Sequence, residues 1–285
     1  MKLISEKGVK RILGTVAFSA ISVLFLIALF ILNEGLPFIF KYGIKEFLFS
    51  SDWQPQQNKF GIFPMITASL WVTFGAMLIG APLGVAGAFF LSEYVPKTIM
   101  KIIKPTIELL AAIPSVVYGF IGVMVLAPII RENFGGPGLS LMAASIILGI
   151  MILPTVISIS IDSILAVPQS YREGSLALGA TTWQTIYMVT VKASKSGIIA
   201  SIILGLGRAI GETMAVIMVA GNSVNIPHSA LDSVRTLTAN IALEMSYATG
   251  LHRQALFATG VILFIVIIIL NSFASVAIRK RARKK

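Results

Sequence analysis

Two charged side chains, Arg208 and Glu212, lie inside an otherwise apolar stretch of the sequence. A charged side chain at the centre of a bilayer costs about 2.5–3.5 kcal/mol on insertion scales, so residues of this kind usually have a function. On a continuous helix the four-residue spacing places both on one face, where they can neutralise each other or share a buried polar ligand. The alternative is a structural ion pair that holds helices together. Because an arginine offers five N–H donors and stays charged, we expect Arg208 to meet an anion that crosses the membrane.

The overall composition indicates that these two charges belong to a membrane protein. The chain has 285 residues, of which 56% are hydrophobic and only 12% are charged, and its mean hydropathy is +0.89. A soluble domain of this size carries about twice that share of charged residues. A spanning helix needs about 20 apolar residues, and six runs of that length predict an all-α polytopic membrane protein with six transmembrane helices. The predicted spans are Ile12–Leu32, Ile62–Leu91, Pro105–Ile130, Leu139–Ile161, Gly197–Gly221 and Ala255–Ile278.

Prolines and glycines inside these spans predict where the helices bend and where they pack. Pro82, Pro114 and Pro154 are expected bend points, because proline lacks the N–H donor of the helical ladder. Two pairs of glycines four residues apart allow the backbones of neighbouring helices to approach closely. These pairs are Gly80 with Gly84, and Gly207 with Gly211.

The positions of lysine and arginine predict the orientation of the chain. Counted over alternate loops, sixteen of these residues lie on one side of the predicted spans and six on the other. Positive residues collect on the cytoplasmic side, so we expect a multi-pass protein of the cytoplasmic (inner) membrane with both termini in the cytoplasm. We divide the chain into residues 1–61, with the first span and an outer loop; a core at residues 62–278, with an inner loop at residues 162–196; and a basic tail at residues 279–285. The tail directly follows a span, so we expect it to lie at membrane lipid rather than to bind nucleic acid.

Two outer segments, residues 33–61 and 222–254, are long enough to form structure outside the bilayer. In the second segment, apolar residues recur at steps of three and four. This spacing predicts a short amphipathic helix at the membrane interface. The residues concerned are Leu231, Val234, Leu237 and Ile241.

The residue patterns expected of an enzyme or a metal site do not occur in this sequence. It contains no cysteine, and His228 and His252 are isolated from each other, so we expect no metal ion. It contains no Gly-x-x-x-x-Gly-Lys-Ser/Thr loop for a nucleotide, and it offers neither a nucleophile with a base nor paired carboxylates for hydrolysis. We therefore expect a non-catalytic subunit without a cofactor, whose energy comes from another protein.

The inner loop has the features of a short docking helix. Pro168 can begin a helix, residues 171–178 contain no breaker apart from Gly174, and Gly179 can end the helix in a left-handed cap. The apolar part of this helix is too small to form a core of its own, so we expect it to enter a groove of a partner protein. The alternative is a helix that rests on lipid headgroups.

The spacing Glu173-Gly-Ser-x-x-x-Gly179 in this loop resembles the EAA loop of ABC importer permeases. Gly174-Ser175 replaces the paired alanines of that loop, and Val189-Thr-Val-Lys192 replaces its usual Ile-x-Leu-Pro ending. In that family the loop forms the coupling helix, which docks into a cleft of the ATPase subunit. The resemblance implies that these residues contact the ATPase: Glu173, Gly174, Ser175, Leu176, Ala177, Gly179 and Ala180.

Two further strings resemble the phosphate importers within this family. Ile113-Pro-Ser-Val-Val-Tyr-Gly119, and Gly205-Leu-Gly-Arg-Ala-Ile-Gly-Glu-Thr-Met-Ala-Val216 followed by Gly221-Asn222, are similar to their permeases, and to the PstC subunit rather than to PstA. The resemblance implies a type I ABC importer permease that passes inorganic phosphate by alternating access. It also implies the partners: a homologous PstA-like permease, two PstB-like ATPase subunits and an extracytoplasmic PstS-like phosphate-binding protein.

The resemblance and the residue chemistry together place four residues in the substrate path: Arg208, Glu212, Ser115 and Tyr118. We hypothesise that Glu212 pairs with Arg208 when the path is empty, and that it releases the arginine or takes a proton as phosphate passes. Thr155 and Ser158 can add hydroxyl groups, although contact between helices is the more common role of such residues.

Other functions are compatible with the same residues. An importer of another oxyanion, such as sulfate or molybdate, needs a site of similar size and charge. A secondary anion transporter or channel would use Arg208 and Glu212 without an ATPase. A membrane sensor would use the inner loop to bind a signalling partner and would show no flux.

Overall fold

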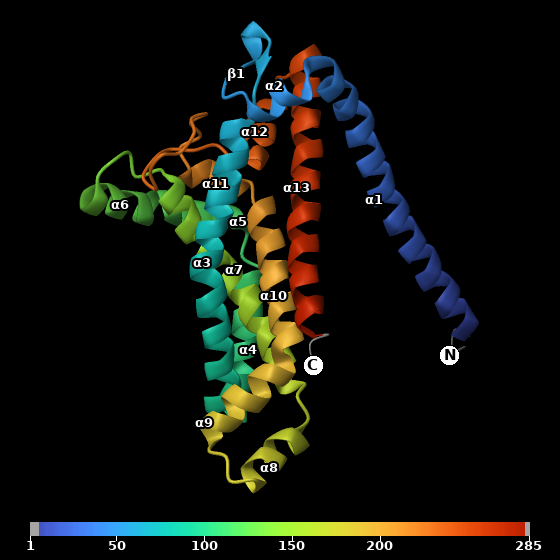
Figure 1. The fold of residues 1–285 in the computed structure, drawn as a ribbon, viewed down its shortest axis with the longest axis vertical. Helices are drawn as coiled ribbons and strands as arrows, with labels where there is room; N and C mark the ends of the chain where they lie inside the picture. Colours follow the sequence, from blue (N-terminus) through green and yellow to red (C-terminus); the bar gives the residue numbers. More distant parts are fainter. Residues whose placement is uncertain (1–5, 283–285) are drawn as a thin grey trace.

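The computed structural model describes the backbone of residues 6–282, and most of that chain is α-helical (Figure 1). Its first part comprises α1 (Glu6–Tyr42), α2 (Ile44–Phe49), an antiparallel hairpin of β1 (Trp53–Gln54) and β2 (Lys59–Phe60) around the 3-10 turn η1 (Pro55–Gln57), and α3 (Phe63–Tyr94). The middle part comprises α4 (Lys97–Ala111), α5 (Ser115–Ile121), the π-helical turn η2 (Gly122–Leu126), α6 (Ala127–Phe134) and α7 (Leu141–Leu165). The last part comprises α8 (Gln169–Ala177), α9 (Thr182–Thr185), the π-helical turn η3 (Ile186–Thr190), α10 (Val191–Gly211), α11 (Met214–Val219), α12 (Leu237–Glu244) and α13 (Gly250–Ala282).

Six helical segments of the described chain are long and apolar enough to cross a membrane, which agrees with the predicted all-α fold. Their bounds are Gly8–Tyr42, Phe63–Tyr94, Ser115–Phe134, Leu141–Leu165, Thr182–Gly211 and Gly250–Ser272. Several predicted bounds are therefore wrong. The first span continues past Leu32, since Pro37 is accommodated inside α1.

The predicted third and fifth spans are each interrupted in the structure. The third was expected to begin at Pro105, but α4 ends at Ala111 and a new helix begins after Pro114. The fifth was expected to run from Gly197 to Gly221, but the helical run begins at Thr182, and α10 ends at Gly211. Of the three predicted bend points, Pro114 coincides with a break, whereas Pro82 and Pro154 lie inside continuous helices.

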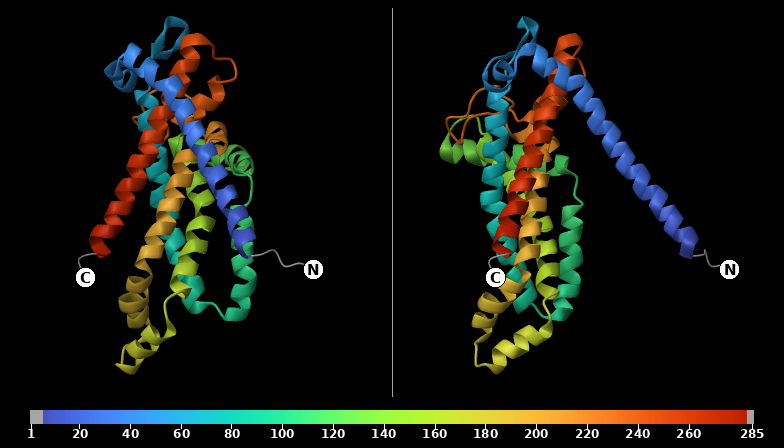
Figure 2. Two further views of the ribbon diagram at one scale, coloured as in Figure 1. Left: turned by 90° about the vertical axis from the view of Figure 1, so that its right-hand side faces the viewer. Right: turned by 45° about the vertical axis from the view of Figure 1, so that its right-hand side comes forward.

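The helices α3, α7, α10 and α13 run along the long axis and form the body of the molecule (Figures 1 and 2). One end carries the hairpin, and the opposite end carries α8 and α9; we call them the hairpin end and the α8 end. The helix α1 packs against α13 near the hairpin and then diverges from the bundle. Both ends of the described chain point toward the α8 end, while α6 lies across the long axis.

Three buried cores hold these helices together, and the smallest of them joins α3, α7 and α10. The main core, which includes Val72, Leu148 and Val216, joins α3, α7 and α11. The second core lies at the hairpin end, where Phe38 of α1 and Phe60 of the hairpin pack with residues of α13. The end of α1 and the hairpin thus pack on α13, and the division of the chain at residue 61 stays a prediction.

The close approach of α3 and α7 depends on the predicted glycine pair of α3. A Cβ atom at Gly80 would lie 2.6 Å from Ile152, and one at Gly84 would lie 2.8 Å from Val156. The second predicted pair, at residues 207 and 211, is wrong for the described chain, because a Cβ atom at either position would meet nothing within 4 Å. The face of α10 that meets α7 carries Gly205 instead, where a Cβ atom would lie 3.0 Å from Val156.

The helix predicted from Leu231 to Ile241 begins later in the structure. Thr236 caps α12 by accepting a hydrogen bond from the backbone N–H of Ala239, so the helix starts at Leu237. Val234 instead donates its backbone N–H to the Ala220 carbonyl at 2.8 Å. The first half of the predicted amphipathic pattern therefore belongs to a loop that packs on α11.

Two substitutions in α3 form a matched test of the packing against α7. A Cβ atom at Gly84 would lie 2.8 Å from Val156, whereas at Gly87 the nearest atom is 3.6 Å away on Ile157. Replacing glycine by alanine stabilises the helix by about 1 kcal/mol at both positions. At Gly84 alone, the added Cβ atom overpacks the contact with α7, which costs about 1–3 kcal/mol. We expect Gly87→Ala to keep or raise the melting temperature in detergent and Gly84→Ala to lower it. Equal melting temperatures of the two variants would show that the α3–α7 contact is not tight.

Candidate functional site

Arg208 lies in the last turn of α10, and it is half-buried. Its Nη1 donates to Thr155 Oγ1 of α7 at 3.2 Å, and its Nη2 donates to the Ala111 carbonyl at 3.2 Å. Ala111 is the last residue of α4. Carbonyl groups in the last turn of a helix lack intrahelical partners and carry partial negative charge. The guanidinium therefore joins three helices and satisfies the end of one of them.

Glu212 does not pair with Arg208, contrary to the prediction from the sequence. Because α10 ends at Gly211 and Glu212 has extended backbone angles (φ −69°, ψ 134°), the two side chains no longer share one helix face. Glu212 Oε1 accepts a hydrogen bond from the N–H of Ala215 at 3.2 Å, in the first turn of α11, where the positive end of a helix stabilises a carboxylate. The freed Glu212 carbonyl accepts a hydrogen bond from Thr238 Oγ1 of α12 at 2.9 Å. The described chain contains no ion pair between these two residues, so the hypothesis that Glu212 pairs with Arg208 in the empty path is wrong for this structure.

Two helix breaks meet beside the guanidinium, at residues 112–114 and 212–213. The helices that follow them pack closely, since a Cβ atom at Gly119 of α5 would lie 3.2 Å from the Cα atom of Ala215 in α11. Irregular backbone at membrane depth is tolerated where protein groups or water satisfy it. Arg208 donates a hydrogen bond to one backbone carbonyl at the first break, and Thr238 donates one to a carbonyl at the second break.

The other two residues predicted in the substrate path lie in α5, at the first break. The hydroxyl of Tyr118 donates to the Leu110 carbonyl at 3.0 Å and thereby bridges α4 and α5. Ser115 is the first residue of α5 and is half-buried, and none of the described hydrogen bonds uses its hydroxyl group. Tyr118 thus has a structural partner, whereas Ser115 keeps a hydroxyl group for another contact.

Thr155 has a more specific position than its sequence context indicates. It was expected to serve in helix contacts, and it does so by accepting the hydrogen bond from Arg208. The second acceptor, the Ala111 carbonyl, is a backbone group and leaves no signal in the sequence. Only the break at Pro114, which ends α4 nearby, could have indicated that a free carbonyl needs a donor.

Unused donors and open space occur together around Arg208. The two described hydrogen bonds use two of the five N–H donors of a guanidinium. The neighbouring Gly207 and Gly211 present no side chain, and an added Cβ atom would meet nothing within 4 Å at either. Charge-assisted hydrogen bonds from arginine to oxyanions are among the stronger polar contacts. The arrangement can therefore receive an oxyanion.

The helix predicted in the inner loop is present as α8 and ends as predicted. Gly179 has a φ of +86°, and its N–H donates to the Leu176 carbonyl at 2.9 Å. The N–H of Ala180 donates to the Ser175 carbonyl at 3.2 Å, which completes a Schellman motif. A residue with a Cβ atom pays roughly 1–2 kcal/mol in this left-handed conformation. Glycine at position 179 therefore fixes how the chain leaves α8.

The surface around α8 is apolar and exposed. Leu178 exposes 91% of its surface and Trp183 exposes 65%, and Leu176 and Tyr187 are exposed as well. Several large apolar side chains exposed within one short segment are typical of an interface with another protein or with a membrane. Glu173 is exposed on the same segment, and no described hydrogen bond or ion pair involves it. The seven predicted coupling residues thus lie in α8 and in the turn that follows it.

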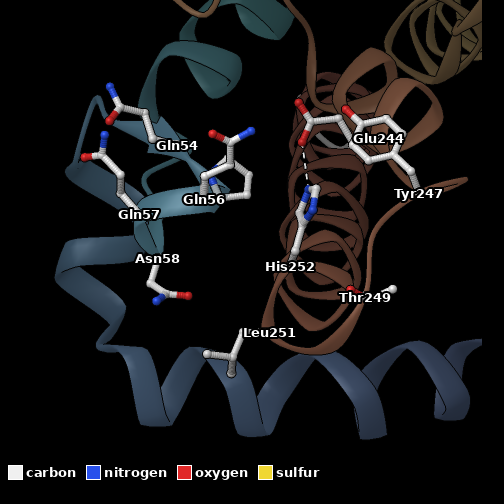
Figure 3. A pocket seen from close by; sticks show the side chains of 10 residues that line it. Gln54, Gln56, Gln57, Asn58, Glu244, Tyr247, Thr249, Leu251 and His252 are labelled. Atoms are coloured by element: carbon white, nitrogen blue, oxygen red, sulfur yellow. Dashed lines mark hydrogen bonds and ion pairs between the residues drawn. The ribbon is translucent and has the colours of Figure 1, made fainter.

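A cavity of about 710 Å³ lies at the hairpin end, between the hairpin and the start of α13 (Figure 3). Tyr247 and His252 line one wall. Desolvation, and then the charge of Glu244, raise the pKa of the Tyr247 phenol above its ordinary value. The opposite wall is formed by the amide side chains of Gln54, Gln56, Gln57 and Asn58.

Glu244 lines this cavity beside Tyr247 and His252 and is almost fully buried. Its Oε2 accepts from Trp53 Nε1 at 2.9 Å and lies 2.8 Å from His252 Nε2, and its Oε1 accepts from Arg235 Nη1 at 2.6 Å. The carboxylate of Glu244, in α12, therefore links this helix to the hairpin, to α13 and to the loop that precedes α12. Among the described residues, no group of three His, Asp or Glu side chains has the arrangement of a metal site.

The sequence has relatives with known names. Residues 80–284 match the family described as "Binding-protein-dependent transport system inner membrane component". The chain is 44% identical over 247 residues to the probable ABC transporter permease protein YqgH of Bacillus subtilis, covering 84% of this chain and 80% of that protein. It is 33% identical over 260 residues to the phosphate transport system permease protein PstC of Pasteurella multocida, covering 84% and 81%. It is 30% identical over 294 residues to the probable PstC of Methanocaldococcus jannaschii, covering 95% and 93%.

Solved structures share the fold at lower sequence identity. A chain of a bacterial ABC transporter involved in the import of the acidic polysaccharide alginate aligns with a TM-score of 0.66 at 17% identity, over 96% of this chain and 98% of that chain. A chain of the inward-facing MetNI methionine ABC transporter aligns with a TM-score of 0.56 at 19% identity, over 77% and 94%. The family match and the shared fold lead to one assignment. The chain belongs to the inner membrane components of binding-protein-dependent transport systems, and it is a permease subunit of an ABC importer.

Proposed function

We propose that this permease passes inorganic phosphate and that Arg208 meets the anion on its way. The observation that carries the proposal is a half-buried guanidinium with unused N–H donors where two helix breaks meet. Phosphate carries about one to two negative charges at neutral pH, so a crossing route must replace its water with strong donors. The similarity to proteins named PstC favours phosphate over other oxyanions.

The other residues of the site have different roles in this proposal. Glu212 is held at the first turn of α11 by the hydrogen bond from Ala215, which leaves the guanidinium available to the substrate. Ser115 adds a neutral hydroxyl donor. Tyr118 and Thr155 hold the break and the guanidinium in place.

The proposed partners follow from the two ends of the molecule. The exposed apolar surface around α8 supports docking of an ATPase there, with Glu173 to Ala180 at the contact. Two ATPase subunits, a homologous permease and an extracytoplasmic phosphate-binding protein complete the importer. The binding protein would meet the hairpin end, which carries the amide-rich cavity. The α8 end then faces the cytoplasm, as the distribution of lysine and arginine predicts.

The Arg208→Gln variant tests the site directly. A hydrogen bond to a charged group contributes about 1.5–3 kcal/mol, and each 1.36 kcal/mol is a tenfold change in rate. We expect phosphate uptake into proteoliposomes to fall about 10- to 100-fold, with a smaller loss in Arg208→Lys, which keeps the charge but not the fork. Arg11→Gln, which removes an exposed arginine of α1 where this helix has diverged from the bundle, serves as the control with unchanged uptake. Full uptake by an assembled, ATP-hydrolysing Arg208→Gln complex would contradict the proposal.

Alanine at Gly179 tests the role of α8. Gly179 (φ +86°) and Gly250 (φ +53°) are both left-handed, and an added Cβ atom would meet nothing within 4 Å at either. Alanine therefore causes backbone strain without a clash at both positions, but only Gly179 orients the proposed ATPase contact. We expect Gly179→Ala to lower phosphate import per ATP several-fold and Gly250→Ala to leave that ratio unchanged. Similar ratios in both variants would argue against a coupling role of this cap.

The proposed function as a whole is tested by reconstituted uptake. The permease is assembled with its companion subunits in vesicles, and uptake of labelled phosphate is measured with ATP, without ATP, and with excess sulfate or molybdate. We expect uptake that needs ATP and the binding protein and that resists both competitors. Flux without ATP would indicate a secondary transporter or channel, competition by sulfate or molybdate would indicate another oxyanion importer, and absence of any flux would indicate a sensor.

A further inference from the structure

The attachment of α8 to the rest of the molecule depends on few contacts. Every residue of α8 is half-buried or exposed, so this helix has no apolar anchor of its own. Arg172 of α8 donates from Nη1 to Glu93 Oε2 at 2.8 Å and from Nη2 to the Ile164 carbonyl at 3.4 Å. The other described side-chain hydrogen bond of α8 joins Ser175 to Thr185 in α9 at 3.0 Å. Of these contacts, the one with Glu93 is the ion pair.

The Arg172–Glu93 pair is shielded from water. The side chains expose 19% and 7% of their surface, whereas those of the ion pair between Lys104 and Asp162, also at the α8 end, expose 32% and 57%. Exposed pairs contribute about 0–1 kcal/mol, but removing one partner of a buried pair leaves an uncompensated charge and is strongly destabilising. Glu93 Oε1 is buried and lacks a hydrogen-bond partner in the described chain, so Arg172 supplies the main compensation for this carboxylate. The pair therefore resists separation.

Glu93 belongs to α3, which packs closely on α7, the helix that carries Thr155 beside Arg208. It lies at the α8 end of α3, whose glycines at positions 80 and 84 touch α7. At Gly84 the contact is Val156 of α7, which also touches Gly205 of α10. Val156 is adjacent to Thr155, which accepts the hydrogen bond from Arg208. A displacement of α3 is thus passed through close contacts to the two helices that hold the guanidinium.

We propose that Glu93 and Arg172 are positioning residues that fasten α8, the proposed ATPase-docking helix, to α3. A movement of α8 then shifts α3 and, through their close packing, α7 beside Arg208. This inference rests on the proposed function, because it requires an ATPase that moves α8. A static packing contact would contribute to assembly and stability alone. A fastening pair also sets how much phosphate is moved for each ATP hydrolysed.

The test measures phosphate import per ATP in proteoliposomes that contain the complete importer. Glu93→Gln and Arg172→Gln each break the pair, and the double variant Glu93→Gln/Arg172→Gln removes both charges, so that neither is left buried alone. Lys104→Gln is the matched control, because it breaks the exposed ion pair at the same end. We expect the double variant to assemble and hydrolyse ATP while its import per ATP falls about tenfold or more. The control is expected to stay within about twofold of the unsubstituted chain.

The outcomes separate the two proposals. An assembled double variant with the import ratio of the unsubstituted complex would overturn the fastening role, whatever the single variants do. If the single variants fail to assemble, the double variant still decides the question. If the unsubstituted complex imports no phosphate with ATP, the proposed function fails, and this inference falls with it.

Discussion

The hydrogen bond from the Arg208 guanidinium to the Ala111 carbonyl is the contact on which the architecture of the site depends. A helix that stops at membrane depth leaves carbonyl groups without partners, and each unsatisfied group costs several kcal/mol in hydrocarbon. An arginine at that depth is costly as well. The partial negative charge at the end of α4 and the charge of the guanidinium offset each other. One contact thus makes a broken helix and a half-buried cation compatible.

The surrounding helices keep that contact at the required distance. Glycines bring α3 and α10 against α7, and both meet it at Val156. The adjacent Thr155 fixes one side of the guanidinium, which leaves its remaining donors directed elsewhere. The carboxylate of Glu212 is held by α11 and does not compete for the arginine. The close packing of these helices therefore leaves part of the Arg208 guanidinium accessible and does not enclose it.

The sequence predicted the features that depend on apolar length and on local turn chemistry. Six spans follow from hydropathy, and the left-handed conformation of Gly179 follows from a glycine after a short helix. The break at residues 212–213 could not be predicted, because apolar residues flank it on both sides and it contains no proline. The same break separates Glu212 from Arg208. Glycine spacing does not reveal which face meets a neighbour, so the pair at residues 80 and 84 was predicted correctly and the pair at 207 and 211 was not.

The central claim is that water and anions reach the face of α10 beside Arg208. The chain contains no cysteine, so a single Gly207→Cys substitution reports on this face, and Leu78→Cys, at an exposed apolar position in the middle of α3, serves as the control. Reactivity with an anionic, membrane-impermeant thiol reagent is measured in the assembled complex, with and without phosphate and in each nucleotide state. The account predicts that Gly207→Cys reacts in at least one state, that phosphate slows the reaction, and that Leu78→Cys stays inert. A Gly207→Cys protein that is unreactive in every state would contradict it.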